Sequence, residues 1–220
     1  MKLHLIWDLD GTLVNSEPEI LATIQKALAQ VGISIHKAKN PLRIGPPLPT
    51  MLRNAFMEED LSDGKLRETV LAFRKIYDSS DFEATLPFEG IDELVCSTDY
   101  VHHVITNKPF LATSRIIERK GWGGHIVEIL TPDALMETDG RQLSKMELFQ
   151  HFRSAYPDVC AVGIGDMAND AACAKSVGLQ AVGVLWGTGT KAELQEAGCD
   201  AIVADASELK AVLKQYGSDE

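Results

Sequence analysis

Short apolar runs alternate along this chain with segments of helical spacing that end in glycine. Each run is bounded by turn-forming or polar residues, which is typical of a buried strand. The expected strands are Leu3–Trp7, Val101–Ile105, Ile126–Leu130, Val159–Ile164, Ala181–Leu185 and Ala201–Val203. The expected helices include Phe110–Lys120 before Gly121, Asp170–Val177 before Gly178 and Lys191–Ala197 before Gly198, since glycine readily takes the left-handed conformation that ends a helix. This alternation predicts an α/β fold, a Rossmann-like doubly wound parallel sheet with helices on both faces.

One stretch, from Ser16 to about Leu86, interrupts the alternation. It contains helical patterns and no convincing strand. Ser16 and Glu19 fit the S-x-x-E pattern of a capping box, and apolar residues then recur at helical spacing until Gly32. Two further helices are expected, at Met51–Met57 and Leu66–Tyr77, and the α/β pattern resumes near Gly90. We therefore expect an α/β core made of residues 1–15 and 87–220, with residues 16–86 inserted as an all-α cap.

The net charge limits the expected partners, and the cysteines indicate the expected cellular compartment. Lys and Arg number 21 against 32 Asp and Glu, a formal net charge of −11, which argues against nucleic acid or an anionic membrane as the main partner. A small anionic substrate stays open, because a bound cation and a lysine reverse the charge locally. The cysteines form no CxxC pair and suggest reduced thiols in a cytoplasmic chain; they are Cys96, Cys160, Cys173 and Cys199. The apolar run at Leu3–Trp7 is too short for a signal peptide or a membrane span.

Polar side chains follow three of the expected strands, at the point where each strand ends. Asp8 and Asp10 follow the first strand, Thr106-Asn107-Lys108 follow the second, and Asp166 and Asp170 follow the strand at Val159–Ile164. In an open parallel sheet these positions lie at the carboxyl edge, where such folds bind ligands. The sequence thus predicts one crevice lined by acidic and hydroxyl groups.

The run Asp8-Leu9-Asp10-Gly11-Thr12 places two carboxylates two residues apart at a glycine turn. One carboxylate can attack phosphorus while the other handles the proton of the leaving group. The alternative is a plain turn, since Asp-Gly pairs are common turn formers. The run Gly163–Asp170 carries Asp166 and Asp170, hard oxygen ligands that suit Mg²⁺ on a loop where glycines allow close approach to a ligand. Its alternative is a helix cap at Asn169 or Asp170.

Two further positions are informative only in combination with these carboxylates. Thr106 by itself fits an ordinary strand residue or a helix cap, and Lys145, at the start of an expected helix Lys145–Ala155, fits a solvated surface lysine.

Taken together, these motifs resemble the haloacid dehalogenase superfamily, and specifically its phosphatases with a helical cap inserted after the first strand. The resemblance covers essentially the whole chain and is carried by Asp8–Thr12, Thr106-Asn107, Lys145, and Gly165-Asp166 with Asp170. The segment from Gly183 to Gly198 and the run Arg43–Leu48 look like those of phosphoglycolate-phosphatase-type members.

The resemblance implies a Mg²⁺-dependent phosphatase that hydrolyses a small phosphomonoester through an aspartyl-phosphate on Asp8. Asp10 would be the general acid and base, and Thr106 and Lys145 would complete the catalytic set. The implied metal ligands are Asp8, Asp10, Asp166 and Asp170. The implied substrate contacts are Gly11, Thr12, Asn107, Lys108 and Arg43. Two departures from the family pattern are Asn15, where relatives often carry Asp, and Lys145-Met146-Glu147, which lacks the proline-containing segment of many relatives; Lys108 and Lys120 are therefore competitors of Lys145.

Several other functions share parts of this pattern. A phosphomutase of the same superfamily, similar to β-phosphoglucomutase, would use the same Asp8 and Asp10. A dehalogenase is disfavoured because it would lack Asp10, and phosphonate cleavage would need a cap lysine, for which none of Lys26, Lys37 and Lys39 stands out. A receiver-like module, from a different class, would be shorter, would lack the helical insertion and would not need Asp10 as an acid. A non-catalytic phosphate-binding protein would usually have lost the nucleophile or a metal ligand, and neither is missing. The expected partner is a small phosphorylated metabolite, and the chain is expected to be a monomer or a homodimer. Arg43 is the candidate for contacting a substrate carboxylate or phosphate. The alternative is that Arg43 is an ordinary surface arginine.

Overall fold

A computed structural model of the protein describes residues 2–134 and 141–217. The chain divides into two compact units, one formed by Met1–Asn15 with Pro87–Glu220 and the other by Ser16–Leu86. We call the first the core unit and the second the inserted unit, and each is described by itself.

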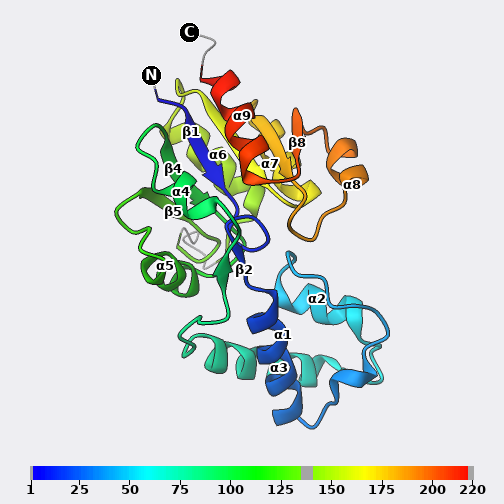
Figure 1. Ribbon diagram of the computed structural model, residues 1–220. Helices are drawn as coiled ribbons and strands as arrows, with labels where there is room; N and C mark the ends of the chain where they lie inside the picture. Colours follow the sequence, from blue (N-terminus) through cyan, green and yellow to red (C-terminus); the bar gives the residue numbers. More distant parts are fainter. Residues whose placement is uncertain (1, 135–140, 218–220) are drawn as a thin grey trace. The chain divides into compact units, whose positions relative to one another are not determined.

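The core unit is built on a six-stranded sheet in the order β5-β4-β1-β6-β7-β8, and every pairing is parallel. Its strands are β1 (His4–Trp7), β4 (Val101–Ile105), β5 (Ile126–Leu130), β6 (Ala161–Gly165), β7 (Gln180–Val184) and β8 (Ala201–Val203). The predicted parallel α/β fold is confirmed, with strand ends that differ from the expected ones by no more than two residues. β1 lies in the middle because the chain crosses from it to β4 and β5 on one side and returns to β6, β7 and β8 on the other (Figure 1).

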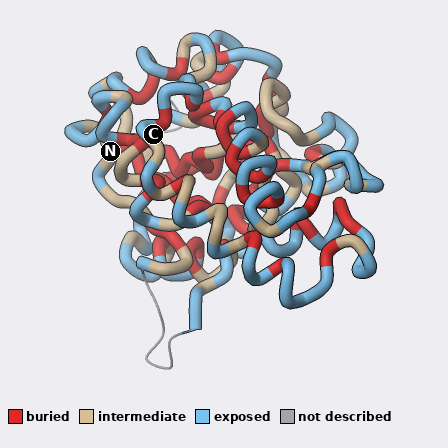
Figure 2. Tube along the Cα trace, turned by 90° about the horizontal axis from the view of Figure 1, so that it is seen from below, coloured by how far each residue is buried: buried red, intermediate tan, exposed pale blue. Residues whose placement is uncertain are grey.

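Helices cover both faces of this sheet. They are α4 (Ile91–Val95), α5 (Phe110–Arg119), α6 (Lys145–Ala155), α7 (Ala168–Ser176), α8 (Lys191–Glu196) and α9 (Ala206–Tyr216). α4 packs against α9, whereas α7 packs against both α6 and α8. The sheet residue Ile6 is buried beneath α6, where Phe149 and Phe152 belong to the same hydrophobic cluster. The residues of β1 beyond His4 are buried, as expected for a central strand with helices on both faces. In Figure 2 the buried segments lie mostly in the interior of the trace and the exposed segments mostly at its edge.

The helix ends largely follow the glycine rule. Gly121, Gly178 and Gly198 have φ values of 76°, 73° and 80°, in the left-handed region that glycine takes without a Cβ clash. α7 begins two residues earlier than expected, and α4 and α9 were not predicted. α9 has a recognisable start, because the side chain of Asp205 accepts hydrogen bonds from the backbone N–H groups of Ser207 and Glu208.

The inserted unit contains α1 (Glu17–Gln30), a 3₁₀ turn η1 (Ile35–Lys37), α2 (Leu48–Ala55) and α3 (Asp63–Tyr77), and α1 packs on α3. α2 and α3 each begin three residues earlier than expected. The short strands β2 (Val14–Asn15) and β3 (Leu86–Pro87) pair with each other where the chain leaves and re-enters the core unit. Both are too short to leave a periodic pattern in the sequence. In the described part of the chain, no helix has the length and apolar character needed to span a membrane.

The predicted capping box at Ser16 and Glu19 is wrong. Ser16 makes no side-chain cap hydrogen bond, and the Glu19 carboxylate instead accepts hydrogen bonds from the hydroxyls of Ser80 and Thr85, the latter at 2.8 Å. Glu19 is buried, so its charge needs donors that the local sequence cannot supply. Those donors come from residues more than sixty positions away.

Candidate active site

The register of the sheet brings the predicted site residues to one edge. Trp7 pairs with Val104 on one side and with Ile164 on the other, so the three strands end at nearly the same level. The backbone N–H of Asp8 still donates to the carbonyl of Ile164 at 2.9 Å. The residues that follow the three strands therefore share the carboxyl edge, next to β1, where the direction of the crossovers changes and open α/β sheets bind ligands.

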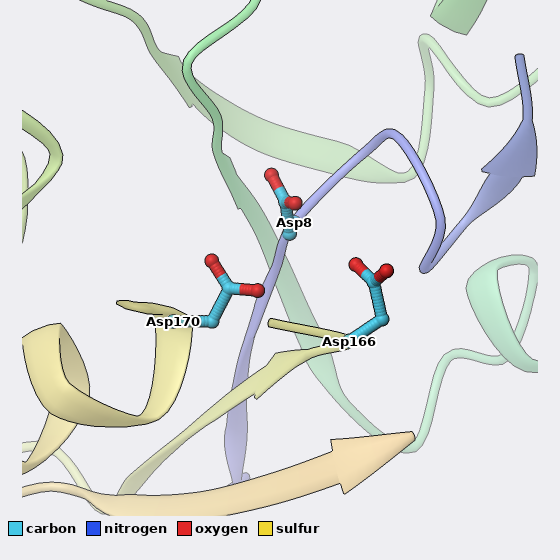
Figure 3. A group of neighbouring side chains, drawn as sticks. All are labelled: Asp8, Asp166 and Asp170. Carbon is cyan, nitrogen blue, oxygen red and sulfur yellow. The ribbon is translucent and has the colours of Figure 1, made fainter. Parts of the chain in front are cut away.

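Three buried carboxylates gather at this edge. Asp8 follows β1, Asp166 follows β6, and Asp170 lies in the first turn of α7 (Figure 3). One carboxylate oxygen of each lies within 4.8 Å of the others. These oxygens are hard donors, grouped closely enough to bind one small divalent cation. Because crowding three carboxylates is unfavourable without a counter-charge, the donor set fits a divalent cation.

Lys145 supplies one counter-charge. Its Nζ lies 2.8 Å from Asp8 Oδ1 and 2.6 Å from Asp170 Oδ1, and its side chain is 4% exposed. Burial by itself lowers the pKa of Lys145, but the carboxylates of Asp170 and Asp8 outweigh it, so the pKa of Lys145 is raised and the lysine stays charged. The reading of Lys145 as a solvated surface lysine is thus wrong. Ser144 and Glu147 form a complete capping box at the start of α6, which fixes the backbone at Lys145.

Burial also perturbs the carboxylates. The pKa of Asp8 is raised to about 6, chiefly by burial; Lys145 opposes the shift, and the like charges of Asp170 and Asp10 add to it. The pKa of Asp166 is raised for the same main reason, burial, with Asp8 as the next cause. Perturbed carboxylates next to a lysine at the ligand-binding edge of a sheet are typical of an active site.

Asp10 and Thr12 both lie in the turn after β1, but their side chains have different partners. Gly11 has φ 82°, and its N–H donates to the carbonyl of Val14 at 2.9 Å, which closes the turn. Thr12 is fully buried and its hydroxyl donates to Asp166 Oδ1 at 3.3 Å. The Thr12 side chain thus has no exposed surface in this structure and supports the Asp166 carboxylate.

Asp10 is paired with Lys108. Lys108 Nζ lies 2.9 Å from Asp10 Oδ2, and the lysine side chain is 4% exposed. The hydroxyl of Thr106 is buried and accepts a hydrogen bond from the N–H of Lys108 at 3.3 Å. The strand-end run Thr106–Lys108 thus reaches the turn that carries Asp10, whereas Lys120 lies at the far end of α5, about 15 Å along the helix axis. Lys120 is excluded as a competitor of Lys145.

The two carboxylate oxygens of Asp170 have different partners. Its Oδ2 accepts from the N–H of Met167 at 3.0 Å, which caps α7, while its Oδ1 binds Lys145. From the sequence we expect the glycines of the run Gly163–Asp170 to allow close approach to a ligand, but in the structure they have another role. A Cβ at Gly165 would overlap the side chain of Asp170, and a Cβ at Gly163 would overlap Ala174. They make room for α7 and not for a ligand.

The loop after β7 was not predicted to belong to the site. The N–H and hydroxyl of Thr188 donate to Asp166 Oδ2 at 2.8 and 3.1 Å, and Trp186 Nε1 donates to the carbonyl of Thr12 at 2.9 Å. The sequence signals here were the alternation of glycine and threonine at residues 187–190 and the family resemblance of the segment from Gly183 to Gly198. Arg43 belongs to the inserted unit, in the segment before α2, and its side chain is exposed.

Known proteins resemble this chain in sequence and in fold. The family model described as haloacid dehalogenase-like hydrolase matches residues 5–184. The chain is 28% identical over 190 residues to a phosphoglycolate phosphatase of Xylella fastidiosa, covering 83% of this chain and 80% of that one. It is 27% identical to a 5'-nucleotidase of Pseudomonas aeruginosa, covering 97% and 96%. Among solved structures, one described as a predicted phosphatase from Clostridium acetobutylicum superposes with a TM-score of 0.80 at 23% identity over 97% of this chain and 99% of that one, which supports the fold. Because the model match covers most of the chain and agrees with the sheet and the carboxylate cluster, the protein belongs to the haloacid dehalogenase-like hydrolases.

Proposed function

We propose that the protein is a Mg²⁺-dependent phosphatase that hydrolyses a small phosphomonoester through an aspartyl-phosphate on Asp8. The observation that carries this proposal is the grouping of Asp8, Asp166 and Asp170 around the buried charge of Lys145. Relatives named phosphoglycolate phosphatase and 5'-nucleotidase support a phosphomonoester as the class of substrate.

The proposed metal site consists of one carboxylate oxygen from each of the three aspartates, together with the backbone carbonyl of Asp10. Mg²⁺ prefers few protein carboxylates and completes its shell with water and a substrate phosphate. When bound, the ion would neutralise charge on the transferred phosphoryl oxygens. Lys145 would hold the Asp8 carboxylate in place and add positive charge beside it.

In the proposed first step, an oxygen of Asp8 attacks phosphorus and the bond from phosphorus to the substrate oxygen breaks. Asp10 gives its proton to that departing oxygen. In the second step, water attacks phosphorus, Asp10 takes the proton of the water, and the bond between phosphorus and Asp8 breaks, which restores both aspartates. Splitting the reaction into two displacements lowers a barrier that is very high for uncatalysed phosphomonoesters.

The phosphoryl oxygens would be held by the Thr106 hydroxyl and by backbone N–H groups at Leu9 and Asn107. Lys108 is paired with Asp10 in the structure. We propose that the incoming phosphate attracts Lys108 and leaves Asp10 available to carry the proton that the first step requires. Positioning and positive charge supply most of the catalysis in phosphoryl transfer.

The inserted unit, residues 16–86, is proposed to act as the cap that selects the substrate, with Arg43 as its candidate contact. The planar guanidinium suits a carboxylate or a second phosphate, as in a phosphoglycolate-like substrate. We also retain a cytoplasmic location and a monomeric or homodimeric state as parts of the proposal.

The test measures release of inorganic phosphate from an aryl phosphate in Mg²⁺ and in EDTA. Asp8→Asn should abolish turnover while the protein stays folded, and Asp158→Asn, at an exposed position, serves as the matched control. In the wild type, rapid quenching followed by mass spectrometry should find one added phosphoryl group on the peptide that carries Asp8. Normal turnover of Asp8→Asn, or equal rates with and without metal, would refute the mechanism. A panel of phosphoglycolate, sugar phosphates and nucleoside monophosphates ranked by kcat/KM would then identify the substrate.

A further inference from the structure

Asp166 is the least exposed of the three aspartates proposed as ligands, at 1% against 6% for Asp170 and 8% for Asp8. Its Oδ2 accepts two hydrogen bonds from Thr188, one from the N–H and one from the hydroxyl, and its Oδ1 accepts the hydroxyl of Thr12. Two segments that lie more than 170 residues apart in the sequence therefore hold one carboxylate from two directions. Both threonines are donors, so they leave the charge of Asp166 in place while they restrict its rotation.

Backbone packing adds to this restriction. Thr188 lies between two glycines, and a Cβ at Gly187 would overlap both the side chain of Asp166 and the carbonyl oxygen of Gly11. A Cβ at Gly189 would overlap the backbone carbonyl of Asp166, and one at Gly11 would overlap its carboxylate. The loop and the turn thus lie against Asp166 more closely than any residue with a side chain would permit.

A third contact joins the loop to the turn. Trp186 Nε1 donates to the carbonyl of Thr12 at 2.9 Å. The segment from Trp186 to Gly189, which we call the β7 loop, is therefore attached at one end to the turn that carries Asp10 and at its middle to Asp166. No part of this loop belongs to the residues proposed above as ligands or catalysts.

We propose that Thr188 is a positioning residue for the divalent cation, which fixes the rotamer of Asp166 so that the carboxylate is already oriented when the metal arrives. This inference rests on the proposed metal site. Its physical basis is that a free carboxylate must give up rotational freedom on ligation, whereas a carboxylate held by donors has already lost it. Partners behind a metal ligand typically change metal affinity about 10- to 100-fold when they are removed.

The experiment compares Thr188→Val with the wild type in metal-free protein titrated with MgCl₂. The melting temperature is recorded at each concentration, because the stabilisation by a ligand depends on its concentration relative to Kd. Since the backbone N–H of Thr188 remains, we expect the low end of the range, a Kd for Mg²⁺ raised about 10-fold. Thr188→Ser retains the hydroxyl and should stay within about twofold of the wild type. If valine prevents folding, Thr188→Ala against Thr188→Ser gives the same comparison.

Thr190→Val is the matched control. Thr190 lies two residues further on, and its hydroxyl forms the capping box of α8 with Glu193. Its replacement should lower the melting temperature without Mg²⁺ but leave the Kd for Mg²⁺ unchanged, which separates loss of loop stability from loss of metal affinity. In phosphate-release assays, Thr188→Val should raise the Mg²⁺ concentration at half-maximal rate about 10-fold, while kcat at saturating Mg²⁺ stays within about twofold.

The outcomes distinguish the two proposals. If Mg²⁺ stabilises the wild type but Thr188→Val has the same Kd, the role of Thr188 is refuted and the metal site stands. If Thr190→Val raises the Kd as much as Thr188→Val does, general loosening of the loop explains the effect and the role of Thr188 is again refuted. If Mg²⁺ does not stabilise the wild type at any concentration, the proposed metal site itself is refuted.

Discussion

His103, on β4, is a buried titratable group far from the carboxylate cluster in the sequence. Its side chain is 0% exposed; Nε2 lies 3.0 Å from His4 Nδ1, and Nδ1 lies 3.7 Å from Glu128 Oε2. The rings of Phe152 and Tyr156 pack edge-on against it, with centroids at 4.9 and 5.1 Å. Burial lowers the pKa of His103 to about 4, with smaller contributions from the neighbouring histidines. The folded protein therefore keeps His103 neutral where an unfolded chain would protonate it.

The sign and size of the effect follow from proton linkage. Between pH 6.5 and about 4 the unfolded chain binds a proton on His103 and the folded chain does not, so stability is full above pH 6.5 and is lost as the pH falls. The slope is about 1.4 kcal/mol per pH unit, which gives about 3 kcal/mol over the whole window. Asp8, with its pKa raised to about 6, acts in the opposite direction in the metal-free protein, as does Glu128, whose pKa is raised mainly by burial. The prediction therefore concerns the difference in unfolding free energy between the wild type and His103→Gln, in which the contributions of Asp8 and Glu128 largely cancel.

The assay is urea unfolding followed by tryptophan fluorescence at pH 7, 6 and 5. The three tryptophans, Trp7, Trp122 and Trp186, all lie in the core unit, so the signal reports the unit that contains His103. From pH 7 to 5 the unfolding free energy of the wild type should fall by about 2 kcal/mol more than that of His103→Gln does. His36→Gln, at an exposed position of the inserted unit, should follow the wild type. Parallel curves for the wild type and His103→Gln, with a difference that stays constant over this range, would refute the reasoning.

Two more predictions concern the site. Lys145→Met leaves Asp8 and Asp170 buried without their lysine, and the unfolding free energy of the metal-free protein should fall by about 3 kcal/mol at pH 8. Urea unfolding should show a smaller loss at pH 5, where Asp8 is mostly protonated. An equal loss at both pH values would contradict this account. Gly187→Ala places a Cβ against Asp166 and the carbonyl of Gly11 and should cost about 1–3 kcal/mol by overpacking. Its control is Gly124→Ala, where a Cβ meets nothing within 4 Å, and similar unfolding free energies for the two variants would contradict the close packing inferred around Asp166.

Much of the core unit could be predicted because its pattern is local. The strand at Val101–Ile105 begins and ends with branched apolar residues and the helix at Phe110–Arg119 is closely followed by Gly121, so both could be predicted without knowledge of their neighbours. The short helix α4 and the two-residue strands β2 and β3 were missed because each has too few residues to repeat a recognisable pattern. The capping box predicted at Ser16 and Glu19 is wrong for a different reason. Its pattern is correct locally, but Glu19 is bonded to distant hydroxyls.

The sequence by itself determined which residue types arrive at the carboxyl edge of the sheet. An aspartate placed directly after a parallel strand must lie at that edge, so Asp8 and Asp166 were predictable from their positions after two apolar runs. The tertiary structure alone decided which side chains are paired there. It showed that Lys145 binds Asp8 and Asp170, that Lys108 binds Asp10, and that Thr188 binds Asp166. These pairings depend on distances of a few ångströms between segments far apart in the chain, and such distances are set by packing, which leaves no periodic trace in the sequence.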